Sequence, residues 1–337
     1  MNNKNLPVVA LTLGDAAGIG PELMARLLSQ PGVTDAANIV LLGDPWLWQD
    51  GQNIAGLTVA SQPVSSLAEV RGRPDASQPA FLATSTIAQE EVTRSLAQPA
   101  CGKAVLEVLN LCMDGAKRGE VDAICFAPLN KQAMKTGGMK HEDELHHFAE
   151  YLGVTAYFCE FNTLGDLWTS RVSSHIPLKD AAAMLSKERI VEAAQLIYKS
   201  LQASGTPEPR VAVAAFNPHG GDGGVCGREE IDIIEPAVAE LRAGGFPVDG
   251  PFPADTIFLK ARDGLYQAIV TMYHDQGQIA IKLMGFSKGV TVQGGLPIPI
   301  TTPAHGTAYD IAGKGLADVN ATLNAFKIAA RMGAARL

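Results

Sequence analysis

Residues 8–22 read VVALTLGDAAGIGPE, and this stretch decides the fold class. Its first part, Val8–Leu13, is a short apolar run that stops at Gly14, which is typical of a buried strand. Its last part predicts a helix, because Pro21 in a first helical turn loses no hydrogen bond and Glu22 complements the positive helix end. A strand, a glycine turn and a helix in this order favour a parallel α/β sheet.

The same alternation continues along the chain, and no internal repeat is present. Because the strand-like runs are continuously apolar, we expect a largely parallel sheet that helices cover on both faces. The expected strands are 38–42, 121–127, 156–160, 170–174, 210–216, 267–273 and 279–284, the expected helices after the first are 105–117, 179–201, 228–242 and 317–332, and residues 61–100 are expected to form peripheral loops.

Length and composition narrow the class of protein. The 337 residues correspond to about two domains. With 47% hydrophobic and 18% charged residues, the chain has the composition of a folded protein. Acidic residues outnumber basic ones by 35 to 27, and no Lys/Arg-rich run is present, so a nucleic-acid partner is not expected. No apolar run reaches the roughly 18–20 residues that cross a bilayer, so no membrane partner is expected either.

The compartment follows from the N-terminus and the cysteines. The first residues lack the apolar segment and the small-residue cleavage site of a signal peptide. The odd number of cysteines is scattered without a CxxC pair, which argues against a disulfide framework and against a zinc finger. We therefore expect a cytoplasmic protein with reduced thiols at Cys101, Cys112, Cys125, Cys159 and Cys226.

Two glycine-rich segments are candidates for binding a nucleotide. Residues 14–22 follow a strand and open a helix, where backbone N–H groups attract anions and glycines allow a close approach. This segment has neither the Lys-Ser/Thr of a P-loop nor a GxGxxG pattern. Residues 305–315 read HGTAYDIAGKG and combine a histidine, a carboxylate and three glycines, which fits backbone contacts to adenine and a carboxylate on ribose hydroxyls. Either segment could instead be a purely structural turn.

Three of the seven histidines directly follow strand-like segments, namely His175, His219 and His274. If they converge, three imidazoles would hold a divalent metal and leave an open position for substrate. They are far apart in the sequence, and each alone could be an ordinary loop histidine. Asp255 and Asp275 are candidates for a general base or for orienting a ligand imidazole, although a loop aspartate can equally be a cap.

At these motifs the sequence resembles the 4-hydroxythreonine-4-phosphate dehydrogenase family of the pyridoxine pathway. The last segment also resembles the cofactor loop of isopropylmalate and isocitrate dehydrogenases. The resemblance runs almost from end to end and is carried by residues 14–22, 174–178, 217–230, 255–256, 273–286 and 295–315.

This resemblance implies two α/β/α domains with largely parallel sheets and an interdomain active-site cleft. We expect residues 1–131 with 290–337 to form a cofactor-side domain, and residues 132–289 to form a domain for metal, substrate and dimerisation. The resemblance further implies an obligate homodimer in which the metal ligands come from both subunits.

The reaction that it implies is oxidation of a β-hydroxy acid to a β-keto acid by NAD or NADP, followed by decarboxylation. A divalent metal would hold the hydroxyl oxygen and stabilise the enolate; zinc is expected, with magnesium, manganese or cobalt as alternatives. The expected site residues are His175, His219 and His274 for the metal; Gly14, Asp15, Gly18, Gly20, His305, Gly306, Thr307, Ala308, Asp310 and Gly313 for the cofactor; His141, Glu142, Asp143, Lys282, Thr291 and Ile300 for the substrate; and Asp255, Asp275 and Lys282 for catalysis.

Three departures from the family's pattern leave the substrate open. The family's Asp-Pro after the first glycine is Asp-Ala here, at residues 15–16. The region of its substrate-binding His-Thr pair reads KHEDELHH at residues 140–147, where His141 matches with a short insertion and Glu144 matches without one. Thr291 replaces a substrate-binding asparagine and Ile300 a substrate-binding arginine, which removes a bidentate anion clamp.

Several alternatives therefore stay open. The substrate could be 4-hydroxythreonine 4-phosphate, a threonate or erythronate phosphate, or an unphosphorylated cis-dihydrodiol carboxylate. Alternatives of another class are a metal-dependent lyase or hydrolase that needs no dinucleotide, and a non-catalytic sensor of small molecules. The lyase or hydrolase would need the histidines but not the loop at 305–315.

Overall fold

The computed structural model describes residues 6–73, 75–285 and 288–337 and divides them between two compact units. Unit 1 comprises the chain up to Thr155 together with Leu296–Leu337, and unit 2 comprises Ala156–Gly295. Residues 132–155 therefore belong to unit 1 and residues 290–295 to unit 2, although the expected boundaries assign each segment to the other domain. The physical reason is packing, since Phe148 of this segment meets Phe126 edge-on with ring centroids 5.8 Å apart. The end of the expected motif 273–286, Phe286, lies outside the described residues.

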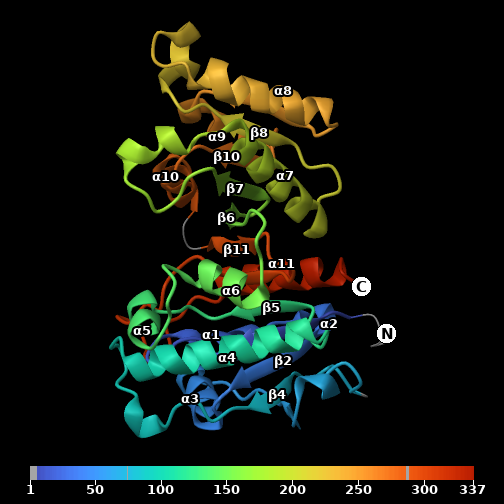
Figure 1. Cartoon of the computed structure of the whole chain (residues 1–337). Helices are drawn as coiled ribbons and strands as arrows, with labels where there is room; N and C mark the ends of the chain where they lie inside the picture. Colours follow the sequence, from blue (N-terminus) through green and yellow to red (C-terminus); the bar gives the residue numbers. More distant parts are fainter. Residues whose placement is uncertain (1–5, 74, 286–287) are drawn as a thin grey trace. The chain divides into compact units, whose positions relative to one another are not determined.

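Unit 1 is built on parallel strands in the order β3-β4-β2-β1-β5-β12, of which β2, β4 and β5 are labelled in Figure 1. Every pair of neighbours in this order runs parallel, as the apolar runs predict. Two of these strands fall within residues 61–100, so the prediction of loops alone was wrong there; both are short and partly exposed. The strands are β1 Val8–Thr12, β2 Asn38–Gly43, β3 Gln62–Val64, β4 Ala80–Ala83, β5 Ala123–Phe126 and β12 Ile300–Pro303.

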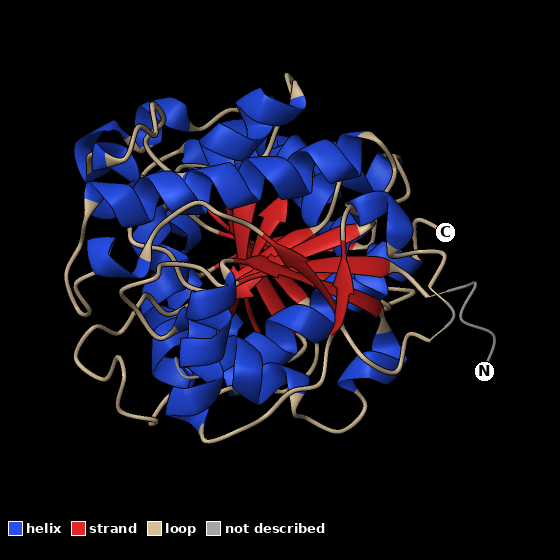
Figure 2. Cartoon of the chain, turned by 90° about the horizontal axis from the view of Figure 1, so that it is seen from below, coloured by secondary structure: helices blue, strands red, loops and turns tan. Residues whose placement is uncertain are grey.

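Helices flank these strands, which lie in the interior in Figure 2. The buried face of the longest helix, α4, packs into the core cluster with residues of β1, β2 and β5. The helices of unit 1 are α1 Gly20–Leu28, α2 Val33–Ala36, α3 Pro45–Ala55, α4 Pro99–Lys117, α5 Lys131–Thr136, α6 Glu144–Leu152 and α11 Asn320–Ala334, with shorter turns η2 Leu67–Glu69 and η3 Gln89–Glu91.

Unit 2 has a mixed sheet in the order β11-β6-β7-β10-β8-β9. β6 runs antiparallel to both β11 and β7, and the remaining pairs are parallel. The largely parallel sheet predicted from the sequence is thus confirmed, with β6 as the exception. The strands are β6 Cys159–Leu164, β7 Leu167–Arg171, β8 Val211–Ala214, β9 Val248–Phe252, β10 Ala268–Thr271 and β11 Val290–Gly294.

The helices of unit 2 correct two predictions. Residues 279–284 are helical rather than a strand: Ile281 is buried while Ile279 and Leu283 are exposed, so the alternation reflects exposed apolar side chains on a helix. The helix expected from residue 179 begins later, at an N-cap formed by Ser186. The helices are α7 Lys187–Ala203, α8 Glu235–Ala243, α9 Ala254–Arg262 and α10 His274–Gly285, with shorter turns η4 Leu178–Asp180, η5 Ala182–Met184, η6 Pro218–Gly224 and η7 Glu230–Ile234.

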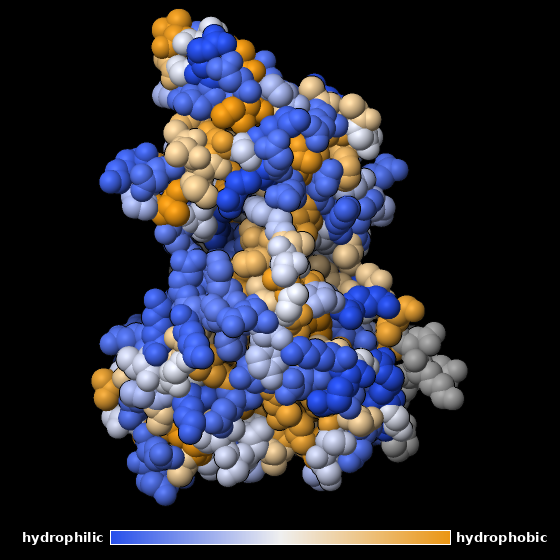
Figure 3. Space-filling model, viewed as in Figure 1, coloured by the Kyte–Doolittle hydropathy of each residue, from blue (hydrophilic) through white to orange (hydrophobic). Residues whose placement is uncertain are grey.

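The surface is mainly hydrophilic, and the cysteines are unpaired, as the composition predicts. Hydrophilic residues predominate on the face shown in Figure 3, with hydrophobic residues in smaller groups. Among the described helices, none combines the length and the apolar character that crossing a bilayer requires. All five cysteines are free, and three of them are buried as small apolar side chains.

Candidate active site

The structure brings the two glycine-rich segments together within unit 1. The backbone N–H of Ile19 donates to the carbonyl of Thr307 across 3.1 Å. Gly18 lies so close that a Cβ there would sit 3.0 Å from the Cβ of Thr307, and Gly14 has a φ of 71° that favours glycine. The glycines of residues 14–20 therefore permit a tight turn and a close approach of the two segments.

A buried carboxylate joins these segments a second time. Asp15 is only 1% exposed; its Oδ1 accepts from the backbone N–H of Ala17 at 2.8 Å, and its Oδ2 accepts from the Tyr309 hydroxyl at 2.8 Å. Burial raises the pKa of Asp15, and the two hydrogen bonds oppose that rise. Ser95 adds a contact from its hydroxyl to the carbonyl of Tyr309 at 2.6 Å.

The rest of the segment at 305–315 presents polar groups to solvent. The carboxylate of Asp310 is exposed, as a partner for ribose hydroxyls would have to be. Ala308 adopts a φ of 44°, a left-handed conformation that costs a residue with a Cβ about 1–3 kcal/mol. Strain of this kind is concentrated at ligand-binding loops, so it agrees with a binding role for this turn.

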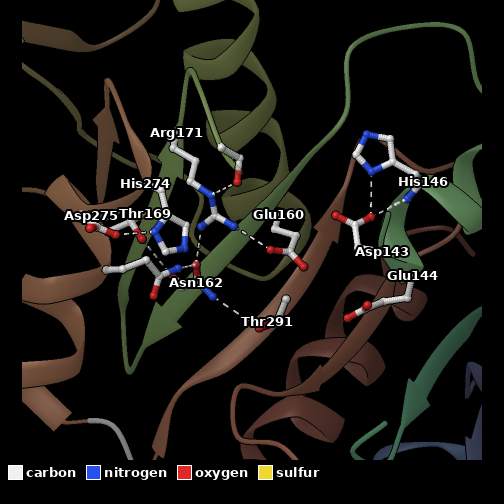
Figure 4. A network of polar contacts seen from close by, with 12 residues as sticks. Asp143, Glu144, His146, Glu160, Asn162, Thr169, Arg171, His274, Asp275 and Thr291 are labelled. Carbon is white, nitrogen blue, oxygen red and sulfur yellow. Dashed lines mark hydrogen bonds and ion pairs between the residues drawn. The ribbon is translucent and has the colours of Figure 1, made fainter. Parts of the chain in front are cut away.

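In unit 2, two of the three predicted metal ligands come together. The rings of His175 and His274 lie 5.6 Å apart between centroids and line one pocket with Ser174 and Tyr273. His274 Nδ1 lies 2.6 Å from Oδ1 of Asp275, which is drawn beside it in Figure 4. A carboxylate on one ring nitrogen orients an imidazole and leaves the other nitrogen for a metal, so these donors fit a divalent metal centre.

The third predicted ligand, His219, is not among the residues that line this pocket. It lies in the turn η6 with a left-handed φ of 55°. The buried carboxylate of Glu230 fixes the entry to this turn, accepting from the backbone N–H groups of Phe216 at 2.8 Å and Asn217 at 2.7 Å. The segment before this turn is also held by the Gln276 side-chain amide, which donates to the carbonyl of Ala215 at 2.7 Å.

Within the part of the chain that the structure describes, a different trio meets the spacing of a metal site. Ligand atoms of Glu142, Asp143 and His146 lie within 4.8 Å of one another. Asp143 also caps α6, where its Oδ1 accepts from the backbone N–H of His146 at 3.0 Å. Because helix capping accounts for Asp143, and imidazole–carboxylate pairing for His146 and Glu142, the trio is explained without an ion.

The other histidines of residues 140–147 also have partners. His141 pairs with Glu150, and His147 Nε2 lies 2.9 Å from Oδ1 of Asn110. Burial and, to a smaller extent, the neighbouring His141 lower the pKa of His147. Glu144, the alternative match to the family's substrate histidine, is buried.

The remaining predicted residues occupy contrasting environments. Lys282 is exposed on α10, and Asp255 is exposed in the first turn of α9. Thr291 is buried on β11, where its hydroxyl accepts from Nδ2 of Asn162 at 3.3 Å. Ile300 has no exposed surface and belongs to the apolar core of unit 1, so in this structure it is a packing residue and not a contact for substrate.

The sequence patterns did not predict one buried network of polar side chains. Asn162 on β6 and Arg171 at the end of β7 are buried and connect to Thr291 and to the segment that carries His175. The available signal was a charged residue within a β-like segment, four residues before His175.

Known proteins share both the sequence and the fold. The family described as "Pyridoxal phosphate biosynthetic protein PdxA" matches residues 35–329. A Pseudomonas aeruginosa protein, provisionally named 4-hydroxythreonine-4-phosphate dehydrogenase 2, is 53% identical over 335 residues, or 99% of each chain. An Oceanobacillus iheyensis protein, provisionally named D-threonate 4-phosphate dehydrogenase, is 34% identical over 95% of this chain and 96% of its own. The crystal structure of 4-hydroxythreonine-4-phosphate dehydrogenase from Klebsiella pneumoniae superposes with a TM-score of 0.84 at 30% identity, covering 97% of this chain and 98% of that one.

These matches, together with the mostly parallel fold, define the class of protein as a dehydrogenase, which confirms the predicted oxidoreductase. The chain belongs to the PdxA family, and the resemblance seen in the sequence is thereby confirmed.

Proposed function

We propose that this protein uses a divalent metal and NAD or NADP to oxidise a β-hydroxy acid to a β-keto acid, which it then decarboxylates. The observation that carries the proposal is the pair His175 and His274 in one pocket, with Asp275 bound to His274. A metal held there with His219 would ease loss of the substrate's hydroxyl proton and offset the charge that develops as CO2 leaves. Zinc suits an imidazole set, with magnesium, manganese and cobalt as alternatives.

The oxidation and the decarboxylation each conserve atoms and electrons. Hydride passes from the carbon that bears the hydroxyl to the nicotinamide, and the hydroxyl proton passes to a base. The bond to the carboxyl carbon then breaks, its electron pair moves toward the new carbonyl, and a proton later returns to carbon. Asp275 is already engaged by His274 and therefore orients it, which leaves Asp255 and Lys282 as candidates for proton transfer.

For the cofactor, we assign binding to the two segments that meet in unit 1. The backbone of Gly14, Gly18 and Gly20 would approach the nucleotide, and the exposed carboxylate of Asp310 would bind ribose hydroxyls. The contact between Asp15 and Tyr309 would hold the two segments in register. His305, Gly306, Thr307, Ala308 and Gly313 would complete this site.

The proposed substrate is a hydroxy acid, either phosphorylated or unphosphorylated. The ammonium of Lys282 would pair with a carboxylate or phosphate. In unit 2, Thr291 would contact the rest of the molecule, and the substrate roles of His141, Glu142 and Asp143 in unit 1 stay predictions. A guanidinium clamp is absent at position 300, where Ile300 is buried, so recognition of a phosphate would depend on other groups.

We further propose a cytoplasmic homodimer in which a second copy contributes to the metal site. Support comes from His219, which lies outside the pocket of the other two histidines. Support also comes from α10, which exposes Ile279 by 59% and Leu283 by 83%, and from Leu178, which is exposed by 70%. Exposed large apolar side chains on one helix suit a surface that a second copy covers.

The test is a turnover assay with each metal, with NAD and NADP, and with a panel of hydroxy acids. The panel contains 4-hydroxythreonine 4-phosphate, threonate and erythronate 4-phosphates, and an unphosphorylated cis-dihydrodiol carboxylate. We expect metal-dependent formation of reduced nicotinamide and of CO2 with at least one of them. Asp310→Ala is expected to raise the KM for NAD strongly; unchanged turnover in this variant would favour a lyase or hydrolase that needs no dinucleotide.

A further inference from the structure

Arg171 is a charged side chain buried at the end of β7, with only 5% of its side chain exposed. Its guanidinium donates in three directions (Figure 4): Nε to Oγ of Ser174 at 2.9 Å, Nη1 to Oδ1 of Asn162 at 2.6 Å, and Nη2 to Oε2 of Glu160 at 2.6 Å. Three charge-assisted contacts on one planar group define its position closely.

Stability alone is a weak explanation for such a group. Desolvating two charges costs about as much as their attraction returns, and apolar replacements of buried ion pairs are often neutral or stabilising. The other residues of β7 are uncharged, buried and able to pack without this cost. The specific directions of the three contacts therefore need another reason.

Two of the three contacts lead toward residues of the proposed metal and substrate site, and the third, to Glu160, pairs the charge. Ser174 directly precedes His175, and the preceding residue Ser173 donates from both its N–H and its hydroxyl to the carbonyl of Met272, two residues before His274. The segments that carry the two histidines are thus held against each other, and Arg171 fixes one of them through its hydrogen bond to Ser174.

Asn162 extends the same network toward the substrate residues. Its Oδ1 accepts from Arg171 and from Gln278 of α10, and its Nδ2 donates to the hydroxyl of Thr291. The network thereby joins β6, β7 and β11 to the helix that begins at His274 and carries Lys282. Because Glu160 neutralises the guanidinium, Arg171 does not substitute for an anion clamp.

We propose that Arg171 is a positioning residue, which with Asn162 sets the placement of His175 and Thr291 for metal and substrate. It touches neither directly. This inference rests on the proposed function, because it assigns Arg171 a role through a predicted metal ligand and a predicted substrate contact.

The experiment compares the wild-type protein with a double variant, Arg171→Met with Glu160→Gln, which removes both charges and leaves no buried charge unpaired. Binding of Co²⁺ to the metal-free protein is measured by calorimetry, and NAD binding is measured in parallel. We expect Co²⁺ affinity to fall by about 10–100-fold, as it does when groups that orient metal ligands are lost. NAD affinity is expected to stay unchanged, and kcat to fall with metal held in excess.

The matched control is Arg73 of unit 1, another buried arginine, whose Nη2 donates to Oδ1 of Asn38 at 2.7 Å. Arg73→Met is expected to lower the melting temperature and to leave Co²⁺ affinity and kcat as in the wild type. A double variant that behaves like Arg73→Met would overturn the inference.

Two further readouts separate the possibilities. Arg171→Lys keeps a charge beside Glu160 but cannot donate in three directions, so its Co²⁺ affinity is expected to remain below that of the wild type; full recovery would overturn the positioning role. If the wild type binds Co²⁺ but turns over no hydroxy acid, the proposed function fails, while the difference in Co²⁺ affinity still decides the role of Arg171.

Discussion

The cofactor segments of unit 1 and the histidine segments of unit 2 are held by different means. In unit 1, residues 14–20 and 305–313 contact each other directly, through Ile19 with Thr307 and Asp15 with Tyr309. In unit 2, His175 and His274 share a pocket that His219 does not line. The buried side chains of Arg171 and Ser173 fix the segments that carry the two histidines. The proposed nucleotide site is thus held by direct contacts between loops, whereas the proposed metal site depends on surrounding polar groups and, in the proposed homodimer, on a second copy.

The sharpest test of this comparison is His175→Ala beside Asp310→Ala. Loss of an imidazole ligand is expected to lower kcat by at least about 10²–10³-fold, as loss of a single group that stabilises charge in a transition state does. Calorimetry should show lost metal affinity with NAD affinity retained in His175→Ala, and the reverse in Asp310→Ala. Equal losses of both ligands in both variants would contradict the separation of the two sites.

The next test places the family's arginine back at position 300. Because Ile300 is fully buried among apolar side chains, Ile300→Arg would bury an unpaired charge and is expected to cost about 3–5 kcal/mol of unfolding free energy. Ile300→Val is the matched control and should cost about 0.5–1.5 kcal/mol. An arginine variant that keeps its stability and gains phosphorylated substrates would show that this side chain reaches the site.

A smaller effect is expected where the two cofactor segments meet. Tyr309→Phe removes one hydrogen bond from the buried carboxylate of Asp15, so we expect the free energy of unfolding to fall by about 1–3 kcal/mol. NAD should bind more weakly, and the metal should bind as before. Chemical unfolding measures the stability, and calorimetry measures the binding of NAD and metal. Weaker metal binding in this variant would contradict the separation of the two regions.

The smallest effect concerns the pH dependence of stability. Burial raises the pKa of Asp15 in the folded protein above its ordinary value of 3.8. The folded state therefore loses stability as the pH rises from below 3.8 through the raised pKa of the folded protein. Asp15→Asn keeps an acceptor for Ala17 without titrating. Its unfolding free energy relative to the wild type should therefore improve from acid to neutral pH; a constant difference would argue against the raised pKa.

Local patterns were enough to predict the fold class. The continuous apolar runs predicted the parallel strands, and Gly14 to Glu22 predicted the turn into α1, because these features depend on burial and backbone sterics within a few residues. Prediction from sequence was wrong for residues 279–284, where apolar side chains at alternate positions face outward on α10. Exposure to solvent is decided by neighbours that a local window does not contain.

The amino-acid pattern was sufficient to predict a mostly parallel α/β protein of the PdxA family, with glycine segments and histidines after its strands. The three-dimensional contacts were needed to show that Asp15 binds Tyr309, that Ile300 is core, and that Arg171 binds Ser174 beside His175. Each of these depends on contacts between segments that are distant along the chain or on neighbouring strands, where burial and hydrogen-bond geometry, rather than residue type, set the outcome.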